Sequence, residues 1–78
     1  MMPKLPSVSG EETIRVLERL GFVRIRQRGS HVSMAKETPD GKRGTVVPLH
    51  RELATGTLRG ILKQANITPE EFIARLKK

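Results

Sequence analysis

Hydrophobic residues change their spacing along the chain, and each change marks a new element. The first segment, 11–20, carries apolar residues at the spacing of one helix face. These residues are Ile14, Val16, Leu17 and Leu20. Ser9 and Glu12 can form a capping box before this segment, and Gly21 follows it, where helices often end in a left-handed conformation. The pattern therefore predicts a first helix over 11–20.

From residue 22 the apolar spacing becomes two, which is typical of a strand with one buried face. Val23 and Ile25 alternate with basic residues. The basic residues are Arg24, Arg26 and Arg28. Gly29 and Ser30 predict a two-residue hairpin connection, in which the glycine supplies a positive φ angle. A second strand is then expected over 31–36.

Packing favours one register for this hairpin. It pairs Arg28 with His31 and sets Ile25 against Met34, so that the apolar side chains share one face. A slip by one residue would move the apolar set of one strand to the opposite face. We therefore expect His31 on the polar face of the sheet, beside Arg28 and near Arg26.

A turn and a third strand follow the hairpin. The sequence Thr-Pro-Asp-Gly within 37–43 is a turn signal, because Pro and Gly suit the corner positions. Apolar residues over 45–49 predict a strand that ends near Pro48. Three strands in this order form an antiparallel meander, and its apolar face needs a cover.

Two helical patterns close the chain. Residues 57–65 are apolar at helical spacing, and Asn66 can end that helix. Thr68 opens the last helix as its cap, Pro69 takes the first helical position and Glu71 completes a capping box. The predicted order is α-β-β-β-α-α, an α+β fold with a three-stranded antiparallel sheet and helices packed on one face. All 78 residues are expected to form a single domain.

Charge and composition narrow the classes of partner. The chain has 15 Lys and Arg against 8 Asp and Glu, a net charge of +7 that attracts nucleic acid or an acidic protein ahead of anionic lipid. Cysteine is absent, which excludes disulfides and thiol chemistry. Phe22 and Phe72 are the only aromatic residues, too few for an aromatic platform that stacks bases. No apolar stretch resembles a signal peptide or a membrane span, so a cytoplasmic protein that does not bind membranes is expected.

His31 lies among cations in the expected hairpin, an arrangement suited to RNA cleavage. Cleavage without a metal uses the RNA 2′-hydroxyl as the nucleophile, so the protein must move protons and stabilise charge on the phosphoryl oxygens. A histidine can do the first and fixed cations the second. The candidate RNA-binding residues around His31 are Arg24, Arg26, Arg28, Gly29, Ser30, Ser33 and Lys36. The same pattern also fits an exposed histidine without a role and arginines that only protect a strand edge.

His50 is the second titratable candidate. It either fixes the loop before Gly56 through a hydrogen bond or forms an acid–base pair with His31. Two histidines far apart in the sequence, with carboxylates at helix starts, offer no convergent set of metal ligands. No metal and no cofactor are therefore expected.

Three segments resemble one known family. They are G-S-H at 29–31, V-V-P-L-H at 46–50 and G-T-L-R-G-I-L-K-Q-A-N-I-T-P-E-E-F at 56–72. In this order and spacing they resemble the HicA toxins, the small messenger-RNA interferases of HicA–HicB toxin–antitoxin pairs. The likeness runs from the helix after Ser9 to Phe72. It implies a fold similar to a double-stranded-RNA-binding domain, a catalytic histidine at His31 and an antitoxin that binds over that surface. Asn66 stands where family members often have Gly.

The resulting functional prediction is the toxin of a type II toxin–antitoxin pair. Such a toxin is an endoribonuclease that cuts messenger RNA without a metal, acts in stress responses and is neutralised by a HicB-like antitoxin; direct DNA binding is not expected. Two alternatives stay open at this point. One is a non-catalytic RNA-binding module, and the other is a subunit that docks an acidic protein through its positive face.

Overall fold

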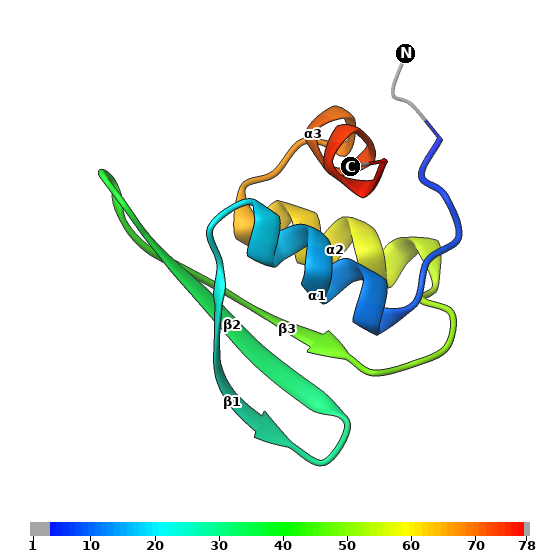
Figure 1. Ribbon diagram of the computed structural model, residues 1–78, viewed down its shortest axis with the longest axis horizontal. Coiled ribbons are helices and arrows are strands. Elements are labelled where there is room, and N and C mark those ends of the chain that lie inside the picture. Colours follow the sequence, from blue (N-terminus) through cyan, green and yellow to red (C-terminus); the bar gives the residue numbers. More distant parts are fainter. Residues whose placement is uncertain (1–3, 78) are drawn as a thin grey trace.

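The computed structural model describes residues 4–77, which form a sheet and three helices in the predicted order (Figure 1). The elements are α1 (Gly10–Arg19), β1 (Val23–Arg28), β2 (His31–Thr38), β3 (Gly41–Pro48), α2 (Thr55–Ala65) and α3 (Pro69–Leu76). The strands pair antiparallel in the order β1-β2-β3. All three helices lie on the same side of the sheet, so the predicted α+β fold is confirmed.

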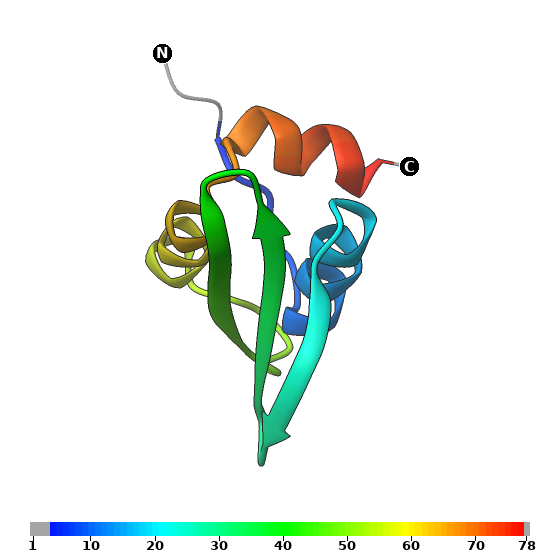
Figure 2. The ribbon, with the colours of Figure 1, turned by 90° about the vertical axis from the view of Figure 1, so that its left-hand side faces the viewer.

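The core fills the space between the helices and one face of the sheet. Helix α2 packs on β3, and α1 packs on both β3 and α3. The largest fully buried apolar side chains are Ile14, Val16, Leu17, Val32, Met34, Val47, Leu58 and Phe72. They come from every element except β1. No helix of residues 4–77 lies over the opposite face of the sheet, and Figure 2 shows the sheet in front with α1 and α2 flanking it.

Local capping signals fix the starts of α1 and α3 and the ends of α1 and α2 as the sequence predicts, whereas α2 begins at Thr55, two residues before its predicted start. Ser9 and Glu12 form both hydrogen bonds of a capping box at α1, and Thr68 and Glu71 repeat the arrangement at α3. Gly21 follows α1 with φ of 98°, and Asn66 ends α2 with φ of 58°. Asn66 therefore supplies the left-handed conformation for which Gly is the usual choice.

The second hairpin differs from its prediction. The expected loop over 37–43 is a two-residue turn, because β2 continues to Thr38 and β3 begins at Gly41. The Thr38 hydroxyl accepts a hydrogen bond from the Asp40 N–H at 3.2 Å and donates one to the Gly41 carbonyl oxygen at 2.6 Å. These bonds close a tight turn, and its end of the sheet extends past the helices in Figure 1.

Strand β1 also departs from its predicted pairing. Arg28 lies opposite His31 and Arg26 opposite Ser33, as expected, but the next pair joins Arg24, not Ile25, to Met34. Ile25 is therefore the extra residue of a β-bulge. The prediction that Ile25 opposes Met34 in the buried face is wrong, and 55% of Ile25 is exposed.

The bulge changes which side chains of β1 face the helices. Val23 pairs with Ala35 on the uncovered face and is 57% exposed, so the expected burial of β1 on one side is also wrong. Arg24 instead takes the place opposite the buried Met34. There its guanidinium meets two carboxylates of α1, Glu11 Oε2 at 3.9 Å and Glu18 Oε2 at 3.7 Å. Charge pairing with α1 thus replaces apolar burial along this edge strand.

Candidate functional site

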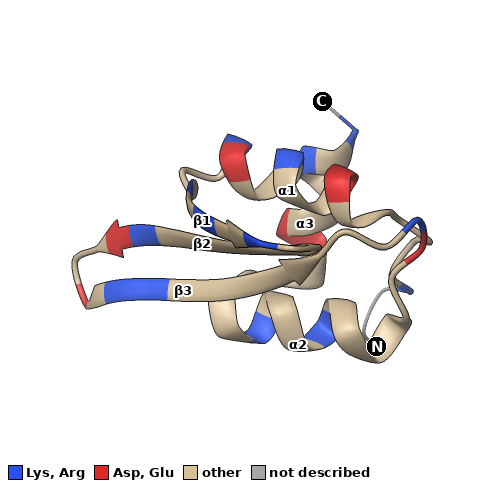
Figure 3. Cartoon of the chain, turned by 90° about the horizontal axis from the view of Figure 1, so that it is seen from below, with Lys and Arg blue, Asp and Glu red and all other residues tan. Residues whose placement is uncertain are grey.

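The uncovered face of the sheet brings most of the predicted site residues together. Strand pairing places Arg28, His31 and Pro48 in one row across the sheet. The next row of the same face contains Arg26, Ser33 and Val46. Because side chains alternate along a strand and Val32 is buried beneath the helices, His31 and Ser33 belong to the opposite, open face. Figure 3 shows basic segments along β1 at this sheet.

His31 is the first residue of β2 and is exposed. The turn before it is built as predicted, with Gly29 at φ of 56°. The Gln27 side-chain amide donates a hydrogen bond to the Gly29 carbonyl oxygen at 2.9 Å. An exposed imidazole that follows a tight turn is accessible from solvent.

Backbone hydrogen bonds connect this turn to the segment after β3 and, through that segment, to α1. The Leu49 N–H donates to the Ser30 carbonyl oxygen at 2.6 Å, which ties the end of β3 to the turn before His31. The Gly10 N–H donates to the His50 carbonyl oxygen at 2.9 Å, which ties the same segment to the start of α1. These two bonds connect the position of His31 to the helical layer.

The three arginines of β1 have different surroundings. Arg24 forms the only ion pairs found among residues 4–77. Arg26 and Arg28 lie on the open face in the rows of Ser33 and His31. Cations without acidic partners are available to phosphate oxygens, whereas the Arg24 guanidinium already contacts two carboxylates. The structure therefore brings two of the three predicted arginines to the histidine.

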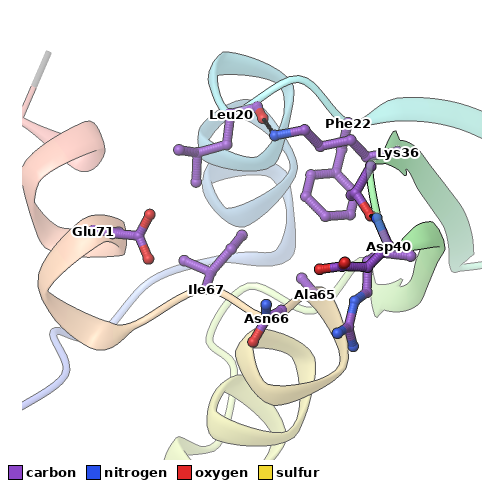
Figure 4. A pocket seen from close by; sticks show the side chains of 10 residues that line it. Leu20, Phe22, Lys36, Asp40, Ala65, Asn66, Ile67 and Glu71 are labelled. Atoms are coloured by element: carbon purple, nitrogen blue, oxygen red, sulfur yellow. Dashed lines mark hydrogen bonds between the residues drawn. The ribbon is translucent and has the colours of Figure 1, made fainter.

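Lys36 does not lie with the other candidates. It belongs to the helix side of β2, and its ammonium Nζ donates to the Leu20 carbonyl oxygen at 2.7 Å. The same ammonium lies 5.9 Å from the centre of the Phe22 ring. Figure 4 shows the hydrogen bond from Lys36 to Leu20, with the Phe22 ring beside it, at the rim of a cavity of about 170 Å³. The cavity lies between the β2–β3 turn and the loop after α2. Lys36 thus stabilises the carbonyl end of α1.

His50 lies outside the strands, and its imidazole is not placed in the row of His31. The hydrogen bond observed at His50 uses its backbone carbonyl oxygen, which accepts from Gly10. This main-chain bond fixes the segment to α1 but does not involve the imidazole, so both hypotheses for the His50 side chain stay predictions.

Among residues 4–77, no group of three or more His, Asp or Glu side chains is placed to hold a metal ion. None of the helices in that range has the length and apolarity needed to cross a bilayer.

One feature of the open face was missed by the sequence patterns. Val23, Ile25 and Val46 are exposed there, although the alternation of β1 suggested burial of Val23 and Ile25. Nothing in the alternation of β1 signals the bulge, because the partners of Arg24 lie on another element.

A comparison with protein families finds a match over most of the chain. A model of the HicA toxin of bacterial toxin–antitoxin systems matches residues 10–67. The match covers α1, the whole sheet and α2, and therefore includes His31 and its neighbours. A comparison with curated proteins finds no match. Because the family match spans well over half of the 78 residues, this chain belongs to the HicA toxins, a family that acts in toxin–antitoxin pairs and implies an antitoxin partner.

Proposed function

We propose that this toxin is an endoribonuclease that cuts messenger RNA in the cytoplasm without a metal ion and is neutralised by a HicB-like antitoxin. His31 is the proposed general acid or base. Arg26 and Arg28 are the proposed phosphate-binding residues, and the turn and strand residues Gly29, Ser30 and Ser33 line the path of the RNA backbone.

One observation carries this proposal: an exposed histidine shares the uncovered face of the sheet with two arginines that have no acidic partner among residues 4–77. Arg28 is its direct cross-strand neighbour, and Arg26 lies one row further along. Directly opposite residues in an antiparallel pair have Cβ atoms about 4.5–5.5 Å apart. A phosphate group bound by the arginines would therefore be within reach of the imidazole.

The chemistry needs two proton transfers at one phosphate. The 2′-oxygen forms a bond to phosphorus as its proton leaves, and the bond from phosphorus to the 5′-oxygen breaks as that oxygen gains a proton. His31 performs one of these transfers, which contributes about 10²–10⁴-fold to the rate. Arg26 and Arg28 stabilise the negative charge that develops on the phosphoryl oxygens. The products are therefore an RNA that ends in a cyclic phosphate and an RNA that begins with a free 5′-hydroxyl.

The test replaces the histidine and measures cleavage and binding separately. His31→Ala should lower the rate of messenger-RNA cleavage by about 10²-fold or more and should abolish growth arrest. Its affinity for RNA should change little, because the arginines remain. If the pure variant cuts RNA at the wild-type rate, the catalytic assignment is wrong. If wild type binds RNA but never cuts it, the non-catalytic module becomes the better interpretation.

A matched pair of arginine variants tests the phosphate contacts. Arg28→Gln and Arg24→Gln remove the same charge from the same strand, but only Arg28 lies beside His31. The dependence of RNA affinity on salt should therefore become shallower by about 0.7–0.9 in logarithmic slope for Arg28→Gln and remain unchanged for Arg24→Gln. Equal effects of the two variants would contradict the placement of the RNA.

A further inference from the structure

The open face of the sheet carries a second feature that RNA cleavage does not use. Val23, Ile25 and Val46 are 57%, 55% and 47% exposed, and these three residues are called the apolar patch. Between them lies Ala35, which is only 6% exposed although no helix covers this face. Ile25, Ala35 and Val46 line one shallow depression across the sheet, and Val23, Ile25 and Ala35 line the next one. The patch is therefore continuous over all three strands.

The β-bulge is the device that creates this patch. In a regular ladder with Arg26 opposite Ser33, Ile25 would lie opposite Met34 and face the helices. The bulge instead turns Ile25 to the open face, where it joins Val23 and Val46. Bulges at sheet edges commonly redirect a side chain in this way. A large aliphatic side chain that is turned outward on an edge strand favours association with another molecule.

RNA does not account for the apolar patch. Aliphatic side chains offer neither hydrogen bonds to phosphates nor aromatic rings for base stacking. The two aromatic side chains, Phe22 and Phe72, are both buried. A protein partner with apolar side chains is the class of molecule that gains from covering Val23, Ile25 and Val46.

Charge distinguishes this partner from a second copy of the chain. In a symmetric dimer the same patch contacts itself, so Arg26 and Arg28 of both copies would be brought together. The net charge of +7 per chain adds to this repulsion. A segment that combines apolar side chains with acidic ones fits both parts of the face.

We propose that the apolar patch is the anchor for an apolar segment of the antitoxin, flanked by acidic residues that meet Arg26 and Arg28. This inference rests on the proposed function in taking the antitoxin as partner. Val46 lies in the row of Ser33, directly beside the row of His31, so a partner seated on the patch also covers the histidine. Neutralisation then shares Arg26 and Arg28 with RNA cleavage, but it also depends on the apolar patch, which cleavage does not use.

The experiment separates these residues by using the protein encoded next to this gene as the antitoxin probe. The double variant Ile25→Thr/Val46→Thr keeps β-branched side chains and strand propensity but removes apolar surface. The matched control Ile25→Val/Val46→Ile keeps the surface apolar. Affinity for the probe is measured by calorimetry in the His31→Ala background, so that it does not depend on catalysis. RNA cleavage and growth arrest are measured with His31 intact.

The threonine variant should bind the probe about 30-fold more weakly than the control, cut RNA at the wild-type rate and arrest growth even when the probe is expressed. Unchanged affinity, or failure of the probe to bind the wild-type chain, overturns the proposal. Loss of RNA cleavage with unchanged affinity assigns the patch to RNA. A wild-type dimer in sedimentation that the threonine variant abolishes assigns it to self-association. An inactive wild-type enzyme with patch-dependent probe binding refutes only the proposed nuclease.

Discussion

Gly10 provides the sharpest test of how α1 is joined to the strand segment beside the site. It is the first residue of α1, is buried, and donates its N–H to the His50 carbonyl oxygen at 2.9 Å. A methyl group added at its Cα would overlap the Pro48 carbonyl oxygen and lie 3.0 Å from the Leu49 Cα. Both obstacles are backbone, so rotation of a flexible side chain cannot relieve them. In Gly10→Ala, α1 must therefore move away from β3.

The cost of that movement can be worked out from its parts. Forced overpacking of a buried site costs about 1–3 kcal/mol, and the lost backbone hydrogen bond adds about 0.5–1.5 kcal/mol. We therefore expect Gly10→Ala to lower the free energy of unfolding by about 1.5–4.5 kcal/mol. For a domain of this size that corresponds to a fall in melting temperature of roughly 6–36 °C.

The matched control is Gly60→Ala in the exposed middle of α2, where an added methyl group meets nothing within 4 Å. Alanine is the better helix former there, so this variant should be more stable than wild type by about 1 kcal/mol. Thermal unfolding followed by circular dichroism measures both variants. A Gly10→Ala variant that melts within about 2 °C of wild type would contradict this expectation, because the close approach of α1 to the strand would then have no energetic consequence.

Two smaller predictions concern the ends of helices. Lys36→Met should lower stability by about 1 kcal/mol, because the Leu20 carbonyl oxygen loses its ammonium donor, and should leave the salt dependence of RNA binding unchanged; a shallower dependence would show that Lys36 contacts RNA. Asn66→Ala should cost about 1–2 kcal/mol at its left-handed position, whereas Asn66→Gly should equal or exceed wild type in urea unfolding; equal stabilities of the two variants would refute this conformational argument.

Much of the fold could be predicted because its signals are local. Capping boxes and turn residues act over three or four positions, which is why the starts of α1 and α3 and the turn at Gly29 match their predictions. The position of His31 on the open face follows from the same turn and from the burial of Val32. These features depend on neighbours in the sequence.

The errors arise where distant elements decide the local structure. Strand β1 alternates apolar and basic residues, so its pattern does not say which set faces the helices. The carboxylates of α1 attract Arg24 inward, and the bulge turns Ile25 outward. Similarly, Lys36 looks like another cation on the strand of His31 until the end of α1 is placed beside it. Both results require tertiary contacts that the spacing alone does not contain.

The bulge itself can be tested by deletion of Ile25. Deleting one residue from a strand normally moves every following side chain to the opposite face. Here Arg24 and Arg26 already pair with the adjacent residues Met34 and Ser33, so deletion of Ile25 makes the ladder regular and leaves every other side chain on its present face. We expect the shortened chain to fold with a free energy of unfolding within about 1 kcal/mol of wild type and to retain RNA cleavage.

A deletion in the central strand provides the contrast. Ser33 lies in a ladder with β3 that has no bulge, so its removal must turn either Val32 or Met34 from the core to solvent. The chain without Ser33 should therefore fail to fold, as judged by the loss of a cooperative thermal transition. If removal of Ile25 unfolds the chain as completely as removal of Ser33, the extra residue is not accommodated in a bulge. The outward placement of Ile25, and with it the origin of the apolar patch, would then be wrong.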